Sequence, residues 1–245
     1  MRSTAFAGRN AKELLRDPLT LIFGIGFPVV LITLISIMRR SIPEMPNTMF
    51  GIENFAPGMA VFGLSFLSLF LGILIAGDRD SSYLARIFAS PMTPADYLWG
   101  YTLPLLPVAA AQGVVCFAYA LLFDLKFSVN LLAAVLVLVP VSLLFIAVGI
   151  LAGCTLTSRQ VGGAASIVVN LAAWLSGTWF DLGMIGGAFE RICRVLPFSH
   201  AVDAVKAAVS GDFGAVLGHL GVTLLYAAVI YAAGAVLFGR RMRGE

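Results

Sequence analysis

The stretch GDRDSSYLARIFASPMTPADYLWG, residues 77–100, is a short polar bridge between two long apolar runs. Asp78, Arg79 and Asp80 stand side by side at its start, in a chain of which only 12% is charged. One charge at a bilayer centre costs roughly 2.5 to 3.5 kcal/mol on insertion scales. This cluster is therefore expected to lie in water and not inside a membrane span.

A short helix is predicted within the bridge. Leu84, Ile87 and Phe88 recur at helical spacing, and Asp80 or Ser81 can cap the first turn. Such a helix has one apolar face. The pattern alone leaves two interpretations open, a connector that lies at the membrane interface or a docking element for a cytoplasmic partner.

A second helix is predicted to begin at Thr93. Thr93 can cap the helix, Pro94 suits the first helical position, and Asp96 can reach back to the amide of Thr93. The bridge is therefore expected to form a helix, a turn and a helix.

The composition points to an integral membrane protein. With 60% hydrophobic and 12% charged residues, the chain is far more apolar than a soluble domain, which is roughly half apolar and a quarter charged. Its net charge is only +3 and its basic residues are scattered at the ends of apolar runs, which argues against nucleic-acid binding. The three cysteines show neither a metal-ligand spacing nor an evident disulfide pair; they are Cys116, Cys154 and Cys193.

The apolar runs predict an all-α fold in one transmembrane domain, residues 1–245. Each run is near the roughly 20 residues that cross a 30 Å hydrocarbon core. The six expected spans are residues 19–38, 56–76, 98–123, 131–154, 161–180 and 218–238. Gly149 and Gly153 in the fourth span are spaced for close helix contact, and Pro28 and Pro104 are expected to bend the first and third spans.

Two segments outside the spans are amphipathic. Residues 1–18 have a basic face and an apolar face, so they predict a helix that lies on the membrane surface. Residues 181–217 predict two further amphipathic helices at the opposite surface, the first ending at Pro197 and the second running from Ser199 to Gly211.

The charges at the ends of the spans predict the orientation. Ten lysines and arginines fall on the side of the bridge and the two termini, against six on the other side. The positive-inside rule therefore places the bridge and both termini in the cytoplasm, with the chain crossing the inner (cytoplasmic) membrane several times.

The sequence lacks the residues that nucleotide binding and catalysis would need. None of its three lysines follows a glycine-rich phosphate loop, so no cofactor is expected on this chain. His200 and His219 lie outside or at the edge of a span with no carboxylate at ligand spacing, so neither a catalytic residue nor a metal site is expected. Gln112 and Asn170, polar residues inside spans, leave open a secondary carrier or lipid-shuttling protein, although Asn170 is also expected to bond a neighbouring helix.

Taken in order along the chain, these features resemble the membrane subunit of an ABC transporter of the ABC-2 type, the class with drug-resistance and polysaccharide export permeases. The resemblance rests on the basic N-terminal helix leading to Pro18 and Pro28, on residues 83–91 leading to Tyr97 and Gly100, on the six spans, and on residues 196–206 before the last span.

The resemblance implies that residues 78–97 form a cytoplasmic coupling loop, whose short coupling helix docks in a groove of a separate ABC ATPase. ATP and Mg²⁺ would be bound by that ATPase. The implied docking residues are Tyr83, Leu84, Arg86, Ile87 and Phe88.

The resemblance also implies a pair of permease copies, with a homodimer expected, which exports an amphipathic cargo such as a drug, lipid or glycan-lipid by alternating access. The second and fifth spans would line the path between the copies. The residues implied there are Phe62, Phe66, Phe70, Asn170 and Trp174. The spacing of the three phenylalanines by itself is more typical of helix packing. A non-transporting anchor for an ATPase is a further alternative.

Overall fold

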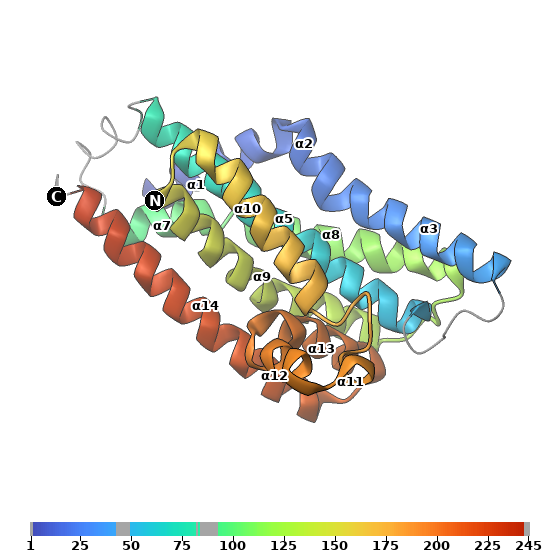
Figure 1. Cartoon of the computed structure of the whole chain (residues 1–245). Coiled ribbons are helices and arrows are strands. Elements are labelled where there is room, and N and C mark those ends of the chain that lie inside the picture. Colours follow the sequence, from blue (N-terminus) through green and yellow to red (C-terminus); the bar gives the residue numbers. More distant parts are fainter. Residues whose placement is uncertain (1, 43–49, 82, 84–92, 243–245) are drawn as a thin grey trace.

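The computed structural model describes residues 2–42, 50–81, 83 and 93–242, and every regular element in these ranges is helical. The helices form an elongated bundle, shown in Figure 1. In chain order they are α1 (Arg2–Arg16), α2 (Pro18–Leu21), the π-helical turn η1 (Ile22–Gly26), α3 (Phe27–Ser41), α5 (Ile52–Asp80), α7 (Pro94–Thr102), α8 (Leu105–Ala120), the 3₁₀ turn η2 (Leu121–Phe123), α9 (Asn130–Thr155), α10 (Ser158–Leu175), α11 (Leu182–Ile185), α12 (Gly187–Val195), α13 (Pro197–Ser210) and α14 (Phe213–Met242).

Five helical runs in the described part of the chain are long and apolar enough to cross a membrane. They are Ile22–Ser41, Ile52–Asp80, Pro94–Phe123, Asn130–Thr155 and Phe213–Arg240. The expected fifth span corresponds to α10, an 18-residue helix that lies along the bundle but is not among these five. The all-helical membrane fold is thus confirmed with five candidate spans, and the count of six stays a prediction.

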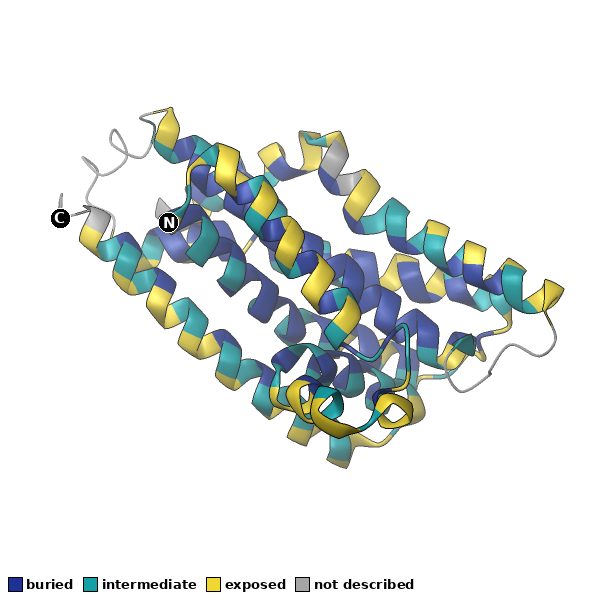
Figure 2. Cartoon of the chain, in the orientation of Figure 1, coloured by how far each residue is buried: buried dark blue, intermediate teal, exposed yellow. Residues whose placement is uncertain are grey.

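Helix α5 is the centre of the bundle. It packs against α9, α10, α13, α8 and α3, and it is buried along nearly its whole length, as Figure 2 shows. In contrast, α3 and α14 flank the bundle and expose much of their apolar surface. Exposed apolar side chains are the expected surface of a helix that faces lipid.

The two glycines predicted for close contact hold α9 against α5. A Cβ atom at Gly149 would lie 2.9 Å from the carbonyl oxygen of Ser68, and one at Gly153 would lie 2.7 Å from the Cβ of Ile75. Both distances are shorter than side chains tolerate, so the backbones of α5 and α9 approach as closely as they do only because these positions lack a side chain.

Proline residues interrupt the first and third spans near the expected places. The π-helical turn η1 ends at Gly26, two residues before Pro28, whose ring nitrogen cannot donate the usual bond to the carbonyl oxygen of residue 24. In the third span α7 ends at Thr102 and α8 begins at Leu105, with Pro104 between them.

Several helices begin or end a few residues away from the expected span boundaries. The second span begins at Ile52, inside the expected polar loop of residues 41–55, because Ile52 and Phe55 are buried in the bundle. Helix α10 begins three residues earlier and ends five residues earlier than the expected fifth span. It begins with a capping box in which the Thr157 amide donates to Gln160 Oε1 at 3.1 Å, and it stops before Gly177, whose φ is +70°.

The segment before the last helix differs from the expected pair of surface helices. It holds α11, α12 and α13, and α13 is buried against α9, α14 and α5 instead of lying at the surface. The predicted inward residues Val202 and Val205 are fully buried. The predicted stop is confirmed, since Gly211 ends α13 with a left-handed φ of +84°.

Candidate functional site

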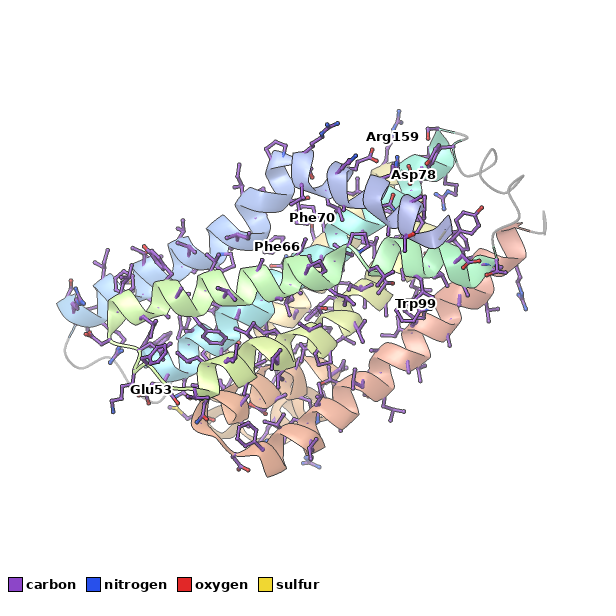
Figure 3. The ribbon with its side chains drawn as sticks, turned by 180° about the vertical axis from the view of Figure 1, so that it is seen from behind. Glu53, Phe66, Phe70, Asp78, Trp99 and Arg159 are labelled. Carbon is purple, nitrogen blue, oxygen red and sulfur yellow. The ribbon has the colours of Figure 1, made fainter. Side chains whose placement is uncertain are left out.

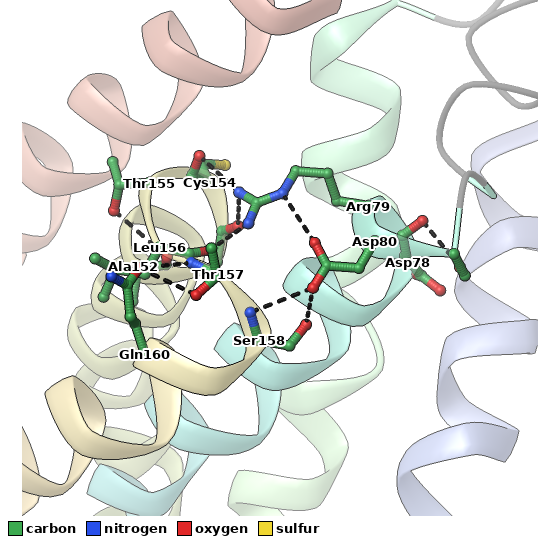
Figure 4. Close-up of polar contacts among 12 residues, drawn as sticks. Asp78, Arg79, Asp80, Ala152, Cys154, Thr155, Leu156, Thr157, Ser158 and Gln160 are labelled. Carbon is green, nitrogen blue, oxygen red and sulfur yellow. Dashed lines mark hydrogen bonds and ion pairs between the residues drawn. The ribbon is translucent and has the colours of Figure 1, made fainter.

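The bridge joins the bundle through the three charged residues that end α5. Because successive residues of a helix point in directions about 100° apart, Asp78, Arg79 and Asp80 each reach a different neighbour. We call this cluster with its partners the bridge base; it consists of Arg9, Asp78, Arg79, Asp80, Tyr101 and Ser158. Figure 4 shows the part of it around Arg79 and Asp80.

Asp78 is buried, with 5% of its surface exposed, although the cluster was expected to lie in water. Its two carboxylate oxygens accept hydrogen bonds from Nη1 and Nη2 of Arg9 at 2.7 and 2.8 Å, and the hydroxyl of Tyr101 donates to Oδ2 at 2.8 Å. This two-pronged pairing lets a charged carboxylate lie inside the bundle. Burial disfavours the charged form of Arg9, but Asp78 more than offsets it and raises the pKa of Arg9, so the guanidinium stays charged.

Helix α1 is seated on α7 so that Arg9 meets Asp78. The ring of Phe6 lies edge-on to Tyr97 and Tyr101, with centroids 5.7 and 4.9 Å apart. The Asn10 side chain donates to the carbonyl oxygen of Gly100 at 3.0 Å. Gly100 is required there, because a Cβ atom would lie 2.3 Å from the Phe6 ring.

Arg79 and Asp80 connect α5 to the ends of two other helices. Arg79 donates to the carbonyl oxygens of Gly153, Cys154 and Leu156, which lie at the C-terminus of α9. Asp80 accepts from the hydroxyl and the amide of Ser158, in the first turn of α10. A cation at a helix C-terminus and an anion at an N-terminus both satisfy free backbone groups and the helix dipole. Asp80, expected to cap the bridge helix, thus binds α10.

The far side of the bridge is also fixed. The Thr93 amide donates to Asp96 Oδ2 at 2.9 Å and the Asp96 amide donates to Thr93 Oγ1 at 3.3 Å, so the predicted capping box is confirmed at the start of α7. Through the contacts of Asp78, Arg79 and Asp80 described above, the bridge base joins five helices, α1, α5, α7, α9 and α10.

Of the implied docking residues, the structure describes Tyr83. The guanidinium carbon of Arg9 lies 4.5 Å from the centroid of the Tyr83 ring, in a cation–π contact. Tyr83 therefore contacts the bridge base through Arg9. The implied residues Leu84, Arg86, Ile87 and Phe88 lie outside the described part of the chain.

The three phenylalanines implied for the cargo path pack the first span against the second. Phe62, Phe66 and Phe70 are buried on α5, two of them labelled in Figure 3. The rings of Phe62 and Phe66 meet Phe23 and Phe27 of the first span at centroid distances of 5.7 to 6.0 Å, and Phe70 stacks on Phe66 at 6.4 Å. In this structure they form the helix-packing stripe that their spacing favours.

The other two implied residues lie on the exposed face of α10. Trp174 is 56% exposed and stacks on Phe180, with centroids 5.5 Å apart. Asn170 is exposed and donates to the Ser166 carbonyl oxygen of its own helix at 2.8 Å, not to a neighbouring helix as expected. The implied cargo residues therefore fall into two groups on different helices. Gln112, by contrast, is buried and donates to the carbonyl oxygen of Ala60 at 2.9 Å.

The sequence analysis missed Arg9, Asn10 and Tyr101 as site residues. One signal was present, since Asn10 lies three residues after Ala7 and four before Leu14 on the apolar face of the N-terminal helix. A polar amide on such a face indicates a partner inside the bundle. Nothing local distinguishes Arg9 or Tyr101 from other arginines and tyrosines at the ends of spans.

Comparison with known proteins identifies the family. The profile of the ABC-2 type transporter family matches residues 3–209, so this chain belongs to that family and is a membrane component of an ABC transporter. Permeases of this family work with ATPase partners in the membrane. The resemblance inferred from the bridge and the spans is thus confirmed.

Among curated proteins the chain is similar to Nodulation protein J of Rhizobium meliloti (strain 1021). The two are 30% identical over 78 residues, which is 31% of this chain and 30% of the relative. The match therefore spans less than a third of either protein.

Proposed function

We propose that this chain is the permease of an ATP-driven exporter, and that residues 84–88 of the bridge dock on a separate cytoplasmic ATPase that binds ATP and Mg²⁺. Two copies form a homodimer in the inner membrane and move an amphipathic or lipid-like cargo outward. The observation that carries the proposal is the bridge base, which fastens both sides of the bridge to five helices.

The bridge base favours a mechanical role over a passive connector. A segment that merely lies at the interface needs no buried charge, whereas Asp78 is held inside the bundle by three hydrogen bonds from α1 and α7. Contacts of this kind have discrete arrangements and do not deform continuously. A push on the bridge would therefore reach α1, α5, α7, α9 and α10 together.

Docking is tested by a charge on the apolar face of the helix that the sequence predicts within the bridge. Phe88→Asp is expected to weaken co-purification with the ATPase by about 30-fold, the effect of losing one buried hot-spot side chain. Lys126→Asp is the matched control, since Lys126 is exposed at the opposite end of the bundle and its replacement leaves the interaction unchanged. Full ATPase binding by the Phe88 variant would refute the docking proposal.

The exposed face of α10 supports a second copy as its partner. Ser166, Ile167, Asn170 and Trp174 lie on this face, and the side-chain amide of Asn170 donates to the Ser166 carbonyl oxygen of its own helix. Polar groups of this kind are unfavourable against lipid and are typical of helix–helix interfaces in membranes. The cargo path would then run between the two copies.

Cysteine cross-linking tests this arrangement. Ile167→Cys is expected to form a disulfide between two copies in membranes, with most of the chain converted to the dimer. Val229→Cys, on the exposed face of α14, is the control and is expected to stay monomeric. The reverse pattern would place the interface on α14 and contradict the proposal.

The alternative of a carrier without an ATPase is weakened for Gln112, because this buried amide donates to the carbonyl oxygen of Ala60 inside the bundle. Transport by the purified chain alone in proteoliposomes would favour that alternative. Normal ATPase docking without cargo-stimulated ATP turnover would instead indicate a non-transporting anchor.

A further inference from the structure

The two histidines of the chain meet at the end of the bundle opposite the bridge. His200 lies in the first turn of α13 and His219 in the second turn of α14, and their Nδ1 atoms are 2.9 Å apart. The Nε2 atom of His200 is 2.8 Å from the carbonyl oxygen of Arg194, in the last turn of α12. Figure 1 shows these three helices gathered at this end. Both rings are half-buried, so protons can reach them from solvent.

The contacts assign the protons of the pair. A carbonyl oxygen only accepts, so Nε2 of His200 must carry a hydrogen and donate to Arg194. Neutral His200 then has its lone pair on Nδ1. The Nδ1 of His219 must therefore carry the hydrogen that bridges the two rings.

We propose that His200 and His219 form a pH-sensitive clasp between α13 and α14, which stays closed with no added proton or one and opens with two. The first added proton can go to the free Nε2 of His219, and the bond between the rings is kept. The second would have to go to Nδ1 of His200, which places two N–H groups and two positive charges face to face across 2.9 Å. The contact cannot survive that arrangement.

A second hydrogen bond between helices lies near the clasp. Tyr226 on α14 donates to the carbonyl oxygen of Val195 at 3.0 Å, which ties α12 to α14 whatever the state of the histidines. Opening of the clasp would therefore leave α12 tied to α14. Helix α9, which packs on both α13 and α14, carries no charged residue. The charged residues that the neighbouring elements bring to this end are Glu53 of α5, Glu190, Arg191 and Arg194 of α12, Asp203 and Lys206 of α13, Asp181 before α11 and Asp212 before α14.

The clasp depends only on the geometry of this end and not on the proposed exporter function. If the bridge faces the cytoplasm, the clasp faces the outer compartment, where the pH is set by the surroundings. It would then loosen the outer end of the bundle in acid.

The protonation states can be measured directly, because the chain has only two histidines. In the full-length protein labelled with ¹⁵N-histidine, we expect near pH 8 the Nε2–H tautomer for His200 and the Nδ1–H tautomer for His219. On acidification, Nδ1 of His200 should be the last of the four ring nitrogens to gain a proton, because that proton breaks the bond between the rings. Protonation of His200 Nδ1 before His219 Nε2, or reversed tautomers near pH 8, would overturn the proposal.

A second experiment tests whether protonation moves the helices. Asparagine can place its amide where His219 has Nδ1, and this amide can donate to neutral His200 or accept from protonated His200. The two pH values compared are 7.5 and 5, on either side of the ordinary pKa of histidine near 6.5. From the first to the second, the melting temperature should therefore fall by about 2 to 4 °C more in the wild type than in His219→Asn. Phenylalanine cannot bond His200, so His219→Phe should have the lower melting temperature of the open clasp at both pH 7.5 and pH 5. An equal fall in the wild type and His219→Asn would show that the clasp does not open.

Discussion

Asp78 is stable inside the bundle because three donors from two other helices surround its carboxylate. Arg9 supplies two of them and Tyr101 the third. Arg9 also pairs with Glu13 at 2.6 Å, but Glu13 is half-exposed and lies on the same helix. The two carboxylates that pair with the Arg9 guanidinium therefore differ in the elements that they connect. Asp78 joins α5 to α1, whereas Glu13 only adds to a turn of α1.

This difference predicts the effect of neutralising each carboxylate. Asp78→Asn leaves Arg9 without its buried counter-charge, which is expected to cost about 2 kcal/mol of stability, less than for a fully buried pair because Arg9 is partly exposed. Glu13→Gln removes an exposed i, i+4 pair and should cost no more than about 0.5 kcal/mol. Reversible unfolding in detergent measures both.

The same variant also tests the mechanical role of the bridge base. Asp78→Asn should still co-purify with the ATPase, since the docking residues are unchanged, while cargo-stimulated ATP turnover falls. Unchanged turnover in this variant, despite its lower stability, would show that the bridge base only supports the fold.

At the scale of the helices, the contact between α5 and α9 decides how tightly the bundle is packed. Lipid offers an apolar side chain nearly the same surroundings as another helix, so close approach of the backbones supplies much of the attraction. Glycines at Gly149 and Gly153 allow that approach. On α14 the glycine at Gly221 has no such neighbour, because nothing lies within 4 Å of the Cβ it lacks.

Alanine at these glycines should therefore have opposite effects. Gly149→Ala forces α9 away from the backbone of Ser68 and is expected to destabilise the protein by about 1 to 3 kcal/mol. Gly221→Ala meets no neighbour and should be neutral or stabilising by up to about 1 kcal/mol, since alanine favours the helix. Equal effects at the two sites would contradict the packing argument.

The whole molecule has two different ends. The bridge base, α1 and the last turns of α14 lie at one end of the bundle, and α11, α12 and α13 lie at the other (Figure 1). Charged contacts between helices concentrate at the first end, where a cytoplasmic ATPase would push. The second end holds the histidine pair and the polar face of α12.

Cysteine labelling decides which end faces the cytoplasm. Ser81→Cys, at the exposed start of the bridge, is expected to react with a membrane-impermeant reagent only after the cells are opened. Lys126→Cys, exposed at the other end, should react in intact cells. Labelling of the Ser81 variant from outside would reverse the orientation and exclude docking on a cytoplasmic ATPase.

The sequence alone determined the membrane class, most of the helical elements, and the capping box of Thr93 and Asp96. These features follow from composition and from contacts between residues close in the chain, where spacing fixes geometry. The tertiary structure decided that Asp78 is buried against Arg9, 69 residues away, that α13 lies inside the bundle, and that His200 meets His219. Which faces of two helices meet depends on the packing of the whole bundle, because apolar periodicity marks a buried face without naming its partner.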